Sequence, residues 1–147
     1  MKRKLAWLSL IMVLTLVLSS CTDPEVKKQA ETAGAIAESI KQMIDIKRQL
    51  GQQNKITKEE ELGLTNALLM ANGADKAYVA GLKKIAGTAT AQDKSNLKPL
   101  LDAFSAAITT IDAGVVGVKN ADAQKNLATI MATIKASVAI LQTFVNS

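Results

Sequence analysis

One cysteine, no histidine and thirteen acidic residues limit the chemistry that this sequence can support. Cys21 is the only thiol among the 147 residues. A Ser–His or Cys–His catalytic pair, an HExxH zinc site and the Glu-x-x-His helices of di-iron bundles all require histidine. Those reaction classes are excluded, so we expect a protein that is not an enzyme, with no catalytic residue and no resident cofactor.

Carboxylates are the metal ligands that remain. Five of them lie on segments with helical periodicity and could converge in a helical core, namely Glu38, Asp45, Asp75, Asp102 and Asp112. Metal sites in helical bundles combine carboxylates with histidines at fixed spacing, so we expect no metal site. Asp75 falls on an apolar stripe, where it would fix the helix register or contact a ligand. A small rotation that turns Asp75 toward solvent is our preferred interpretation.

A basic and then apolar segment opens the chain. Residues 2–4 are Lys-Arg-Lys, and residues 5–18 form an apolar stretch with two polar interruptions. A transmembrane helix needs roughly 20 apolar residues, so this shorter stretch is typical of the core of an export signal. Residues 18–21, which end it, read Leu-Ser-Ser-Cys, and the polar Thr22 follows.

This ending resembles the lipobox of bacterial lipoproteins. In that family the cysteine thiol receives a diacylglyceryl group, signal peptidase II cuts just before the cysteine, and the new amino terminus is often acylated too. The resemblance implies a removed signal peptide over residues 1–20, cleavage between Ser20 and Cys21, and a covalent lipid on Cys21. Several acyl chains hold a protein firmly, because each buried methylene contributes about 0.8 kcal/mol. The alternatives are a buried thiol in a plain signal peptide and an uncleaved N-terminal anchor.

The residue after the cysteine bears on sorting. In enteric lipoproteins an aspartate at that position tends to retain the protein in the inner membrane, whereas this chain has Thr22 there and Asp23 one place later. The resemblance therefore implies a bacterial cell envelope location, with the outer membrane favoured in a host with two membranes.

The positive charge of the chain is mostly part of the signal. Residues 2–4 account for three of the 18 basic residues, and all 13 acidic residues follow Cys21, so the net charge falls from +5 to +2 on cleavage. The aromatic residues after Cys21 are Tyr78, Phe104 and Phe144, and they do not interleave with a basic cluster. We expect no nucleic-acid partner.

The remainder of the chain is predicted to be all-α. Alanine is abundant, and apolar residues recur at spacings of three and four, the period of an amphipathic helix. After a tether at residues 21–24, the sequence predicts helices near 25–53, 58–86, 93–118 and 122–146. Short connections make consecutive helices antiparallel, so residues 25–147 are expected to form an up-down-up-down four-helix bundle. A capping box begins at Thr57, and Gly87 is the expected C-cap of the second helix.

Small residues recur every four positions on the second predicted helix, at Gly73, Ala77 and Gly81. Glycine inside a helix costs roughly 1 kcal/mol relative to alanine, so a compensating contact is expected. Close helix packing is our preferred interpretation. A helix break at Asn72-Gly73 and a groove that accepts an apolar guest are the alternatives.

Residues 99–147 carry few charges, and residues 127–145 hold a single one, Lys135. That length approaches a membrane span, but Asp112 would be costly in lipid. We expect these two helices to be buried or to dock through their outer face, and a homo-oligomer through residues 99–147 is one such arrangement.

These features favour a non-enzymatic, lipid-anchored envelope protein that acts through its helical surface as a structural, adaptor or inhibitory component. Its expected partners are the membrane, through the lipid on Cys21, and a protein of the envelope. The alternative is a carrier or sensor of a small apolar ligand bound between the helices, which would require an internal apolar cavity.

Overall fold

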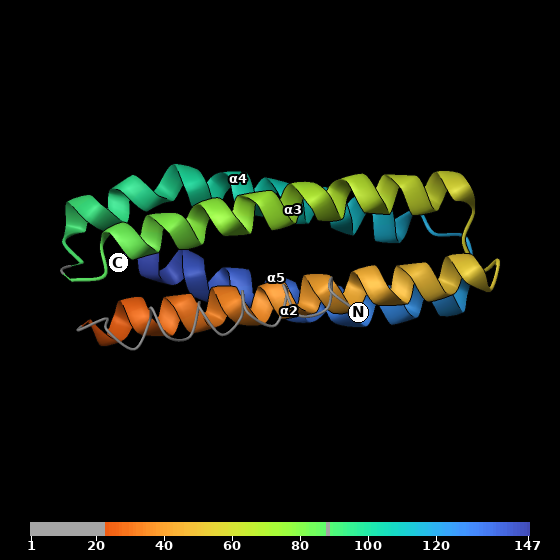
Figure 1. The fold of residues 1–147 in the computed structure, drawn as a ribbon, viewed down its shortest axis with the longest axis horizontal. Helices are drawn as coiled ribbons and strands as arrows, with labels where there is room; N and C mark the ends of the chain where they lie inside the picture. The colour runs from red at the N-terminus through yellow and green to blue at the C-terminus, as the bar shows by residue number, and fades with distance from the viewer. Residues whose placement is uncertain (1–22, 88) are drawn as a thin grey trace, which may run out of the picture.

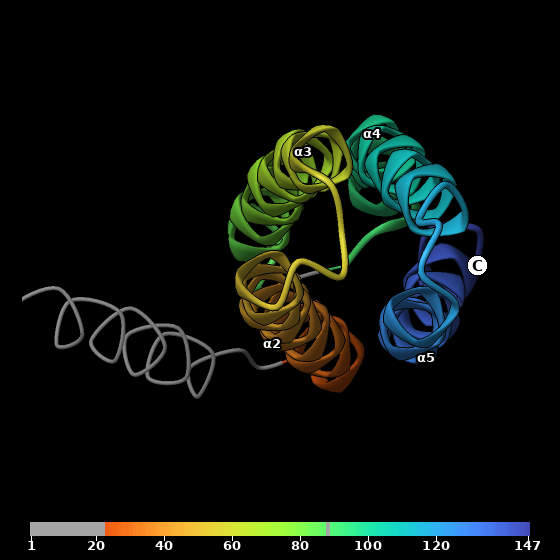
Figure 2. The same cartoon turned by 90° about the vertical axis from the view of Figure 1, so that its right-hand side faces the viewer.

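A computed structural model describes residues 23–87 and 89–147 as a ring of antiparallel helices. Its elements are α2 (Pro24–Gln52), α3 (Lys58–Lys84), α4 (Ala91–Val116) and α5 (Ala121–Val145). Each helix runs opposite to the next, as Figure 1 shows. Each helix packs against the next along the chain, and α5 packs against α2, which closes the ring seen end-on in Figure 2. The predicted all-α four-helix bundle is confirmed for the described residues.

Side-chain caps begin each of the four described helices. Asp23 accepts from the backbone N–H of Glu25 at 2.8 Å, and Asn120 accepts from that of Ala123 at 3.0 Å. Thr57 and Thr90 each form a capping box with the acidic residue three places later. Such caps satisfy backbone N–H groups that have no partner inside the helix. The box at Thr90 also explains why α4 begins at Ala91, two residues before the predicted start.

The C-cap predicted at Gly87 is wrong. Helix α3 ends at Lys84, and Ile85 is its C-cap, with its N–H donating to the Leu82 carbonyl at 3.1 Å. Ile85 is buried in the core. The chain turns inward at Ile85 and buries this side chain, so the helix ends before it reaches Gly87.

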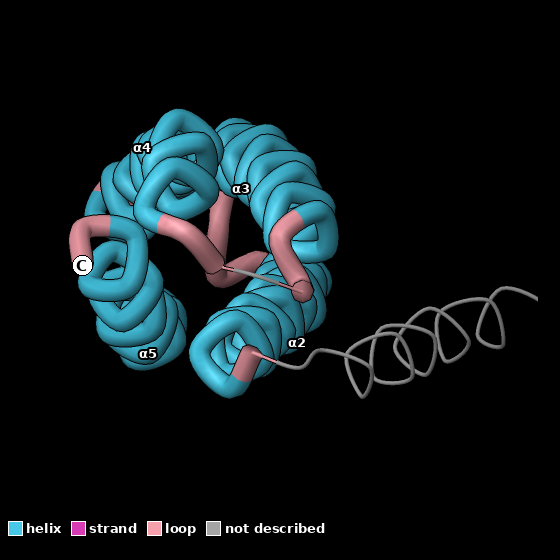
Figure 3. The backbone as a smooth tube through the Cα atoms, turned by 90° about the vertical axis from the view of Figure 1, so that its left-hand side faces the viewer, coloured by secondary structure: helices cyan, strands magenta, loops and turns pink. Residues whose placement is uncertain are grey.

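The core lies along the axis of the ring. Every helix contributes one stripe of buried apolar residues, and the largest fully buried side chains include Tyr78 and Phe104 on neighbouring helices. Removing such stripes from water is the dominant favourable term in folding. The connections cross only the two ends of the bundle, as the tube in Figure 3 shows for the end at which α2 begins.

Helices α4 and α5 are long and apolar enough to cross a membrane by length and composition, and one third (33%) of the most apolar window of each is buried. Core helices of soluble proteins share this property. Here both helices contribute stripes to the common core, and one charge of each pairs with the other, since Lys135 Nζ lies 2.6 Å from Asp112 Oδ2.

Of the three small residues predicted to pack closely, only Gly81 does so. A Cβ atom added at Gly81 would lie 2.7 Å from Cδ2 of Leu97 and 2.9 Å from Cδ1 of Leu100, both on α4. Gly73 has open space around it, and both Gly73 and Ala77 are exposed, so the prediction is wrong for these two. They lie on the outer face of α3 because the core stripe occupies the opposite side. Helix α3 also continues through Asn72 and Gly73 without a break.

We predict that alanine has opposite consequences at two helical glycines. Gly34 of α2 has nothing within 4 Å of an added Cβ, so Gly34→Ala should stabilise the protein by about 0.5–1 kcal/mol through helix propensity. Gly81→Ala should lose that gain, because the buried Leu97 would have to move. Chemical denaturation of both variants measures the difference, and an equal gain at both positions would contradict the close approach of α3 to α4.

Candidate functional site

The predicted lipidation site lies outside the described residues. Ser20 and Cys21, which the lipobox resemblance marks for cleavage and lipid attachment, precede the first described residue, Asp23. Helix α2 begins at Pro24, capped by Asp23, so the bundle starts immediately after the predicted anchor.

Asp75 is buried in the core of the bundle. Asp75 is only 4% exposed, and its Oδ1 atom has no hydrogen-bond partner among the described residues. The interpretation that it turns toward solvent is therefore wrong. Ala71 and Tyr78 lie one turn away on either side and are both fully buried, so a rotation exposing Asp75 would expose them too.

Burial controls the ionisation of Asp75. Loss of hydration disfavours the carboxylate and raises the pKa of Asp75 to about 7, against an opposing effect of the nearby Lys76 ammonium. Burial likewise raises the pKa of the Tyr78 hydroxyl, which also lacks a partner in the described structure. The Asp75 carboxyl therefore changes its charge near neutral pH inside an apolar core.

Two more buried polar groups were not predicted from the sequence. Gln29 of α2 is buried with its Oε1 atom unpartnered in the described structure. Its place between Val26 and Ala33, at steps of three and four, was the signal that could have found it. Lys47 of α2 is buried as well, but its Nζ atom donates to Thr65 Oγ1 at 2.5 Å and lies 3.8 Å from Glu61 Oε1.

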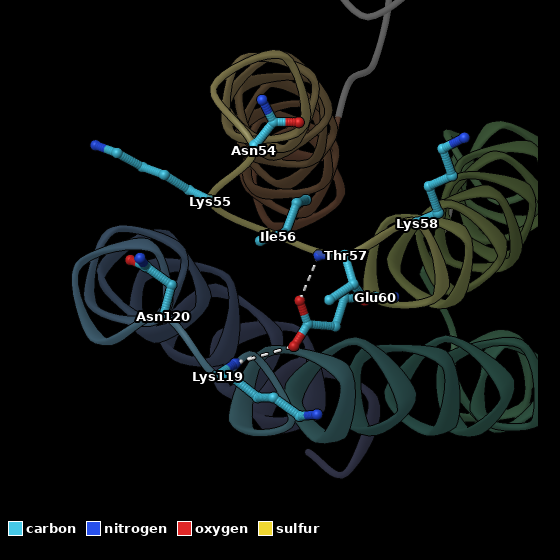
Figure 4. Close-up of a pocket in the computed structure, with 8 residues that line it drawn as sticks. All are labelled: Asn54, Lys55, Ile56, Thr57, Lys58, Glu60, Lys119 and Asn120. Carbon is cyan, nitrogen blue, oxygen red and sulfur yellow. Dashed lines mark hydrogen bonds between the residues drawn. The ribbon is translucent and has the colours of Figure 1, made fainter.

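Glu60 joins two loops at the end of the bundle opposite Pro24. Its Oε2 accepts from the Thr57 N–H at 2.7 Å, and its Oε1 accepts from the Lys119 N–H at 3.0 Å, as Figure 4 shows. The first contact belongs to the α2–α3 connection and the second to the α4–α5 connection. These two backbone hydrogen bonds, that of Thr57 first, lower the pKa of Glu60 below its usual range. We call this the Glu60 bridge.

The Glu60 bridge lies in an open depression of about 490 Å³ with a basic rim. Its lining residues are Asn54, Lys55, Ile56, Thr57, Lys58, Glu60, Lys119 and Asn120 (Figure 4). A second open depression, of about 370 Å³, lies between α2 and α5 near Pro24 and reaches Gln29 and Phe144. Neither is an enclosed apolar cavity of the kind that the carrier hypothesis requires.

The described residues form two open depressions and bury one carboxyl whose pKa lies near neutral. Among residues 23–87 and 89–147, no three Cys, His, Asp or Glu side chains come together in a group that could hold a metal ion. The Glu60 carboxylate is occupied by two backbone donors, and Asp75 lies within the apolar core. The depression around Glu60 has three lysines among its lining residues, Lys55, Lys58 and Lys119.

We predict that Asp75 makes the protein less stable as the pH rises. Folding raises the pKa of Asp75. The contribution of this carboxyl to the free energy of unfolding is therefore greatest below pH 4 and falls until the pH passes 7. The loss should be about 4 kcal/mol, which is the order of magnitude of a pKa difference of that size. Asp75→Asn should remove this dependence and be more stable than the parent at pH 8. Urea denaturation at pH 4 and pH 8 tests this, and parallel profiles for both proteins would contradict it.

We predict that the Glu60 bridge stabilises the end of the bundle opposite Pro24. Glu60→Ala leaves two backbone N–H groups without their acceptor, so the free energy of unfolding should fall by about 1 kcal/mol. Glu31→Ala is the control, because Glu31 is exposed and its side chain makes no hydrogen bond within the described residues. Amide exchange at Thr57 and Lys119 should accelerate in Glu60→Ala alone. Unchanged exchange at Lys119 would show that the two loops are not joined.

The bundle thus combines a buried titrating carboxyl with a basic depression at one end. The depression is formed by two connections far apart in the sequence, which the ring of helices brings together. No protein-family model, no curated protein and no solved structure matches this chain.

Proposed function

We propose that this chain is a lipid-anchored protein of the bacterial cell envelope that acts through its helical surface as a structural, adaptor or inhibitory component, without catalysis. The observation that carries the proposal is the start of the fold. Asp23 caps α2 two residues after Cys21, so the described fold begins directly after the residue that the lipobox resemblance marks for lipidation. A signal cleaved before Cys21 would leave the four described helices intact.

The tether on this interpretation is very short. The proline at the first position of α2 and the Asp23 cap fix the direction in which the chain enters the helix. A helix of 29 residues spans about 43 Å, so a bundle held at Pro24 carries its other end within a few nanometres of the bilayer. Partners in the envelope are therefore expected to be proteins at or near the membrane surface.

The basic depression supports a protein contact. Lys55, Lys58 and Lys119 line it, while the one carboxylate in it, Glu60, is already bonded to the backbone. The Glu60 bridge holds the two loops of this surface in a fixed relation, which lowers the cost of ordering them on binding. An acidic protein surface is the partner chemistry that this end favours.

We predict that the chain isolated from bacterial membranes begins at Cys21 and carries acyl chains. Intact-mass analysis should give residues 21–147 plus the lipid, and Cys21→Ala should lose both the lipid and the cleavage. Thr22→Asp is the matched control, since it should keep the lipid mass. In an enteric host it should also move the protein from the outer to the inner membrane. An unmodified mass that retains residues 1–20 would contradict the anchor.

A further inference from the structure

We propose that a second copy of this chain docks antiparallel along the outer face of α3. This face carries three of the five large apolar side chains that are exposed in the described structure. Leu62, Leu69 and Met70 are 62%, 60% and 60% exposed, whereas α4 and α5 have one such residue each, Val116 and Ile140. Leu69 and Met70 lie seven and eight residues after Leu62, so the three share one side of the helix. A soluble surface seldom gathers apolar side chains in this way without a partner.

The large and small residues of this face are segregated along the helix. The large residues Leu62, Leu69 and Met70 occupy its first half, and the exposed small residues Gly73, Ala77 and Ala80 occupy its second half. An antiparallel pair centred between Ala71 and Asn72 sets the large half of one copy on the small half of the other. Met70 then faces Gly73 of the second copy, and Asn66 faces Ala77. Interlocking of large and small side chains is what allows two helices to pack closely.

The charges at the ends of α3 follow the same symmetry. Its first turn is acidic, with Glu59, Glu60 and Glu61, and its last turn is basic, with Lys83 and Lys84. In the antiparallel pair Glu59 of each copy faces Lys84 of the other, and neither residue has an ion-pair partner within the described residues. A parallel pair would instead oppose acid to acid and base to base. The antiparallel pair is symmetric, because each contact between two residues occurs a second time with the two copies exchanged, as a twofold axis requires.

The same charges favour a second copy over a lipid surface. A lipid surface is anionic and would attract the lysines at one end of the face but repel the glutamates at the other. A second copy satisfies both ends at once. The pairing does not depend on the lipid anchor. The antiparallel pairing places the two Pro24 ends at opposite ends of the dimer. Two copies anchored in one bilayer would therefore lie with their helices along the membrane surface.

Cysteine cross-linking of the full chain in membranes and in mild detergent tests the pairing. Asn66→Cys and Ala77→Cys are the matched variants, because both positions are exposed and face each other across the twofold axis. Within a dimer each position lies about 17 Å along the axis from its own copy, too far for a disulfide. We expect a mixture of the two variants to give at least tenfold more cross-linked dimer than either variant alone or the parent chain, which has only Cys21.

A second substitution separates the interface from the fold. Met70→Lys should reduce the cross-link in the mixture at least tenfold, while Val116→Lys, at a residue 69% exposed on α4, should leave it unchanged. Both variants should keep the helical circular dichroism and thermal melt of the parent. Equal cross-linking in Asn66→Cys alone would overturn the antiparallel arrangement. Absence of a cross-link in the mixture would overturn the proposal. If the introduced thiols were then protected from modification only when vesicles are added, the face would be assigned to lipid.

Discussion

Each of the four described helices buries one apolar stripe, and the four stripes leave water together at the centre of a closed ring. A single amphipathic helix is marginal in water, because most of its stability in a protein comes from the packing of its apolar face. The contact of α5 with α2 completes the enclosure that the sequential contacts begin. The short connections follow from this constraint, since they need only reverse the chain at the ends of the bundle.

The ring tolerates polar groups in its interior to different degrees. Lys47 reaches a hydroxyl and a carboxylate at the edge of the core, so its charge is compensated. Asp75 has no such partner for its Oδ1 atom, and burial keeps its carboxyl in the neutral form until the pH approaches 7. A buried carboxyl without a partner costs stability that an apolar residue would not. Its position between large apolar layers restricts how α3 can rotate or slide.

The outside of the bundle divides into surfaces of different chemistry. One end has lysines around a rigid pair of loops, whereas the outer face of α3 is apolar along most of its length and charged only near its ends and at Lys76. Charged rims favour the orientation and rate of encounter with a partner, and apolar faces supply most of the binding free energy. The two surfaces therefore correspond to the two partners that we propose, an acidic protein at the end and a second copy along the side.

For the described residues, the sequence by itself determined the class of the fold, the number of helices and their bounds to within two residues, because helical periodicity and capping are local properties of the chain. The composition also excluded the catalytic pairs and metal sites that require histidine. The tertiary structure decided how each helix is rotated about its axis, and so which residues face the core. Helix α3 could place Asp75 outside only by exposing Tyr78 and Ala71, and Gly81 rather than Gly73 met the neighbouring helix. The Glu60 bridge joins residues 59 positions apart, and no local pattern specifies such a contact. Its formation depends on the ring of helices that brings the two loops to the same end.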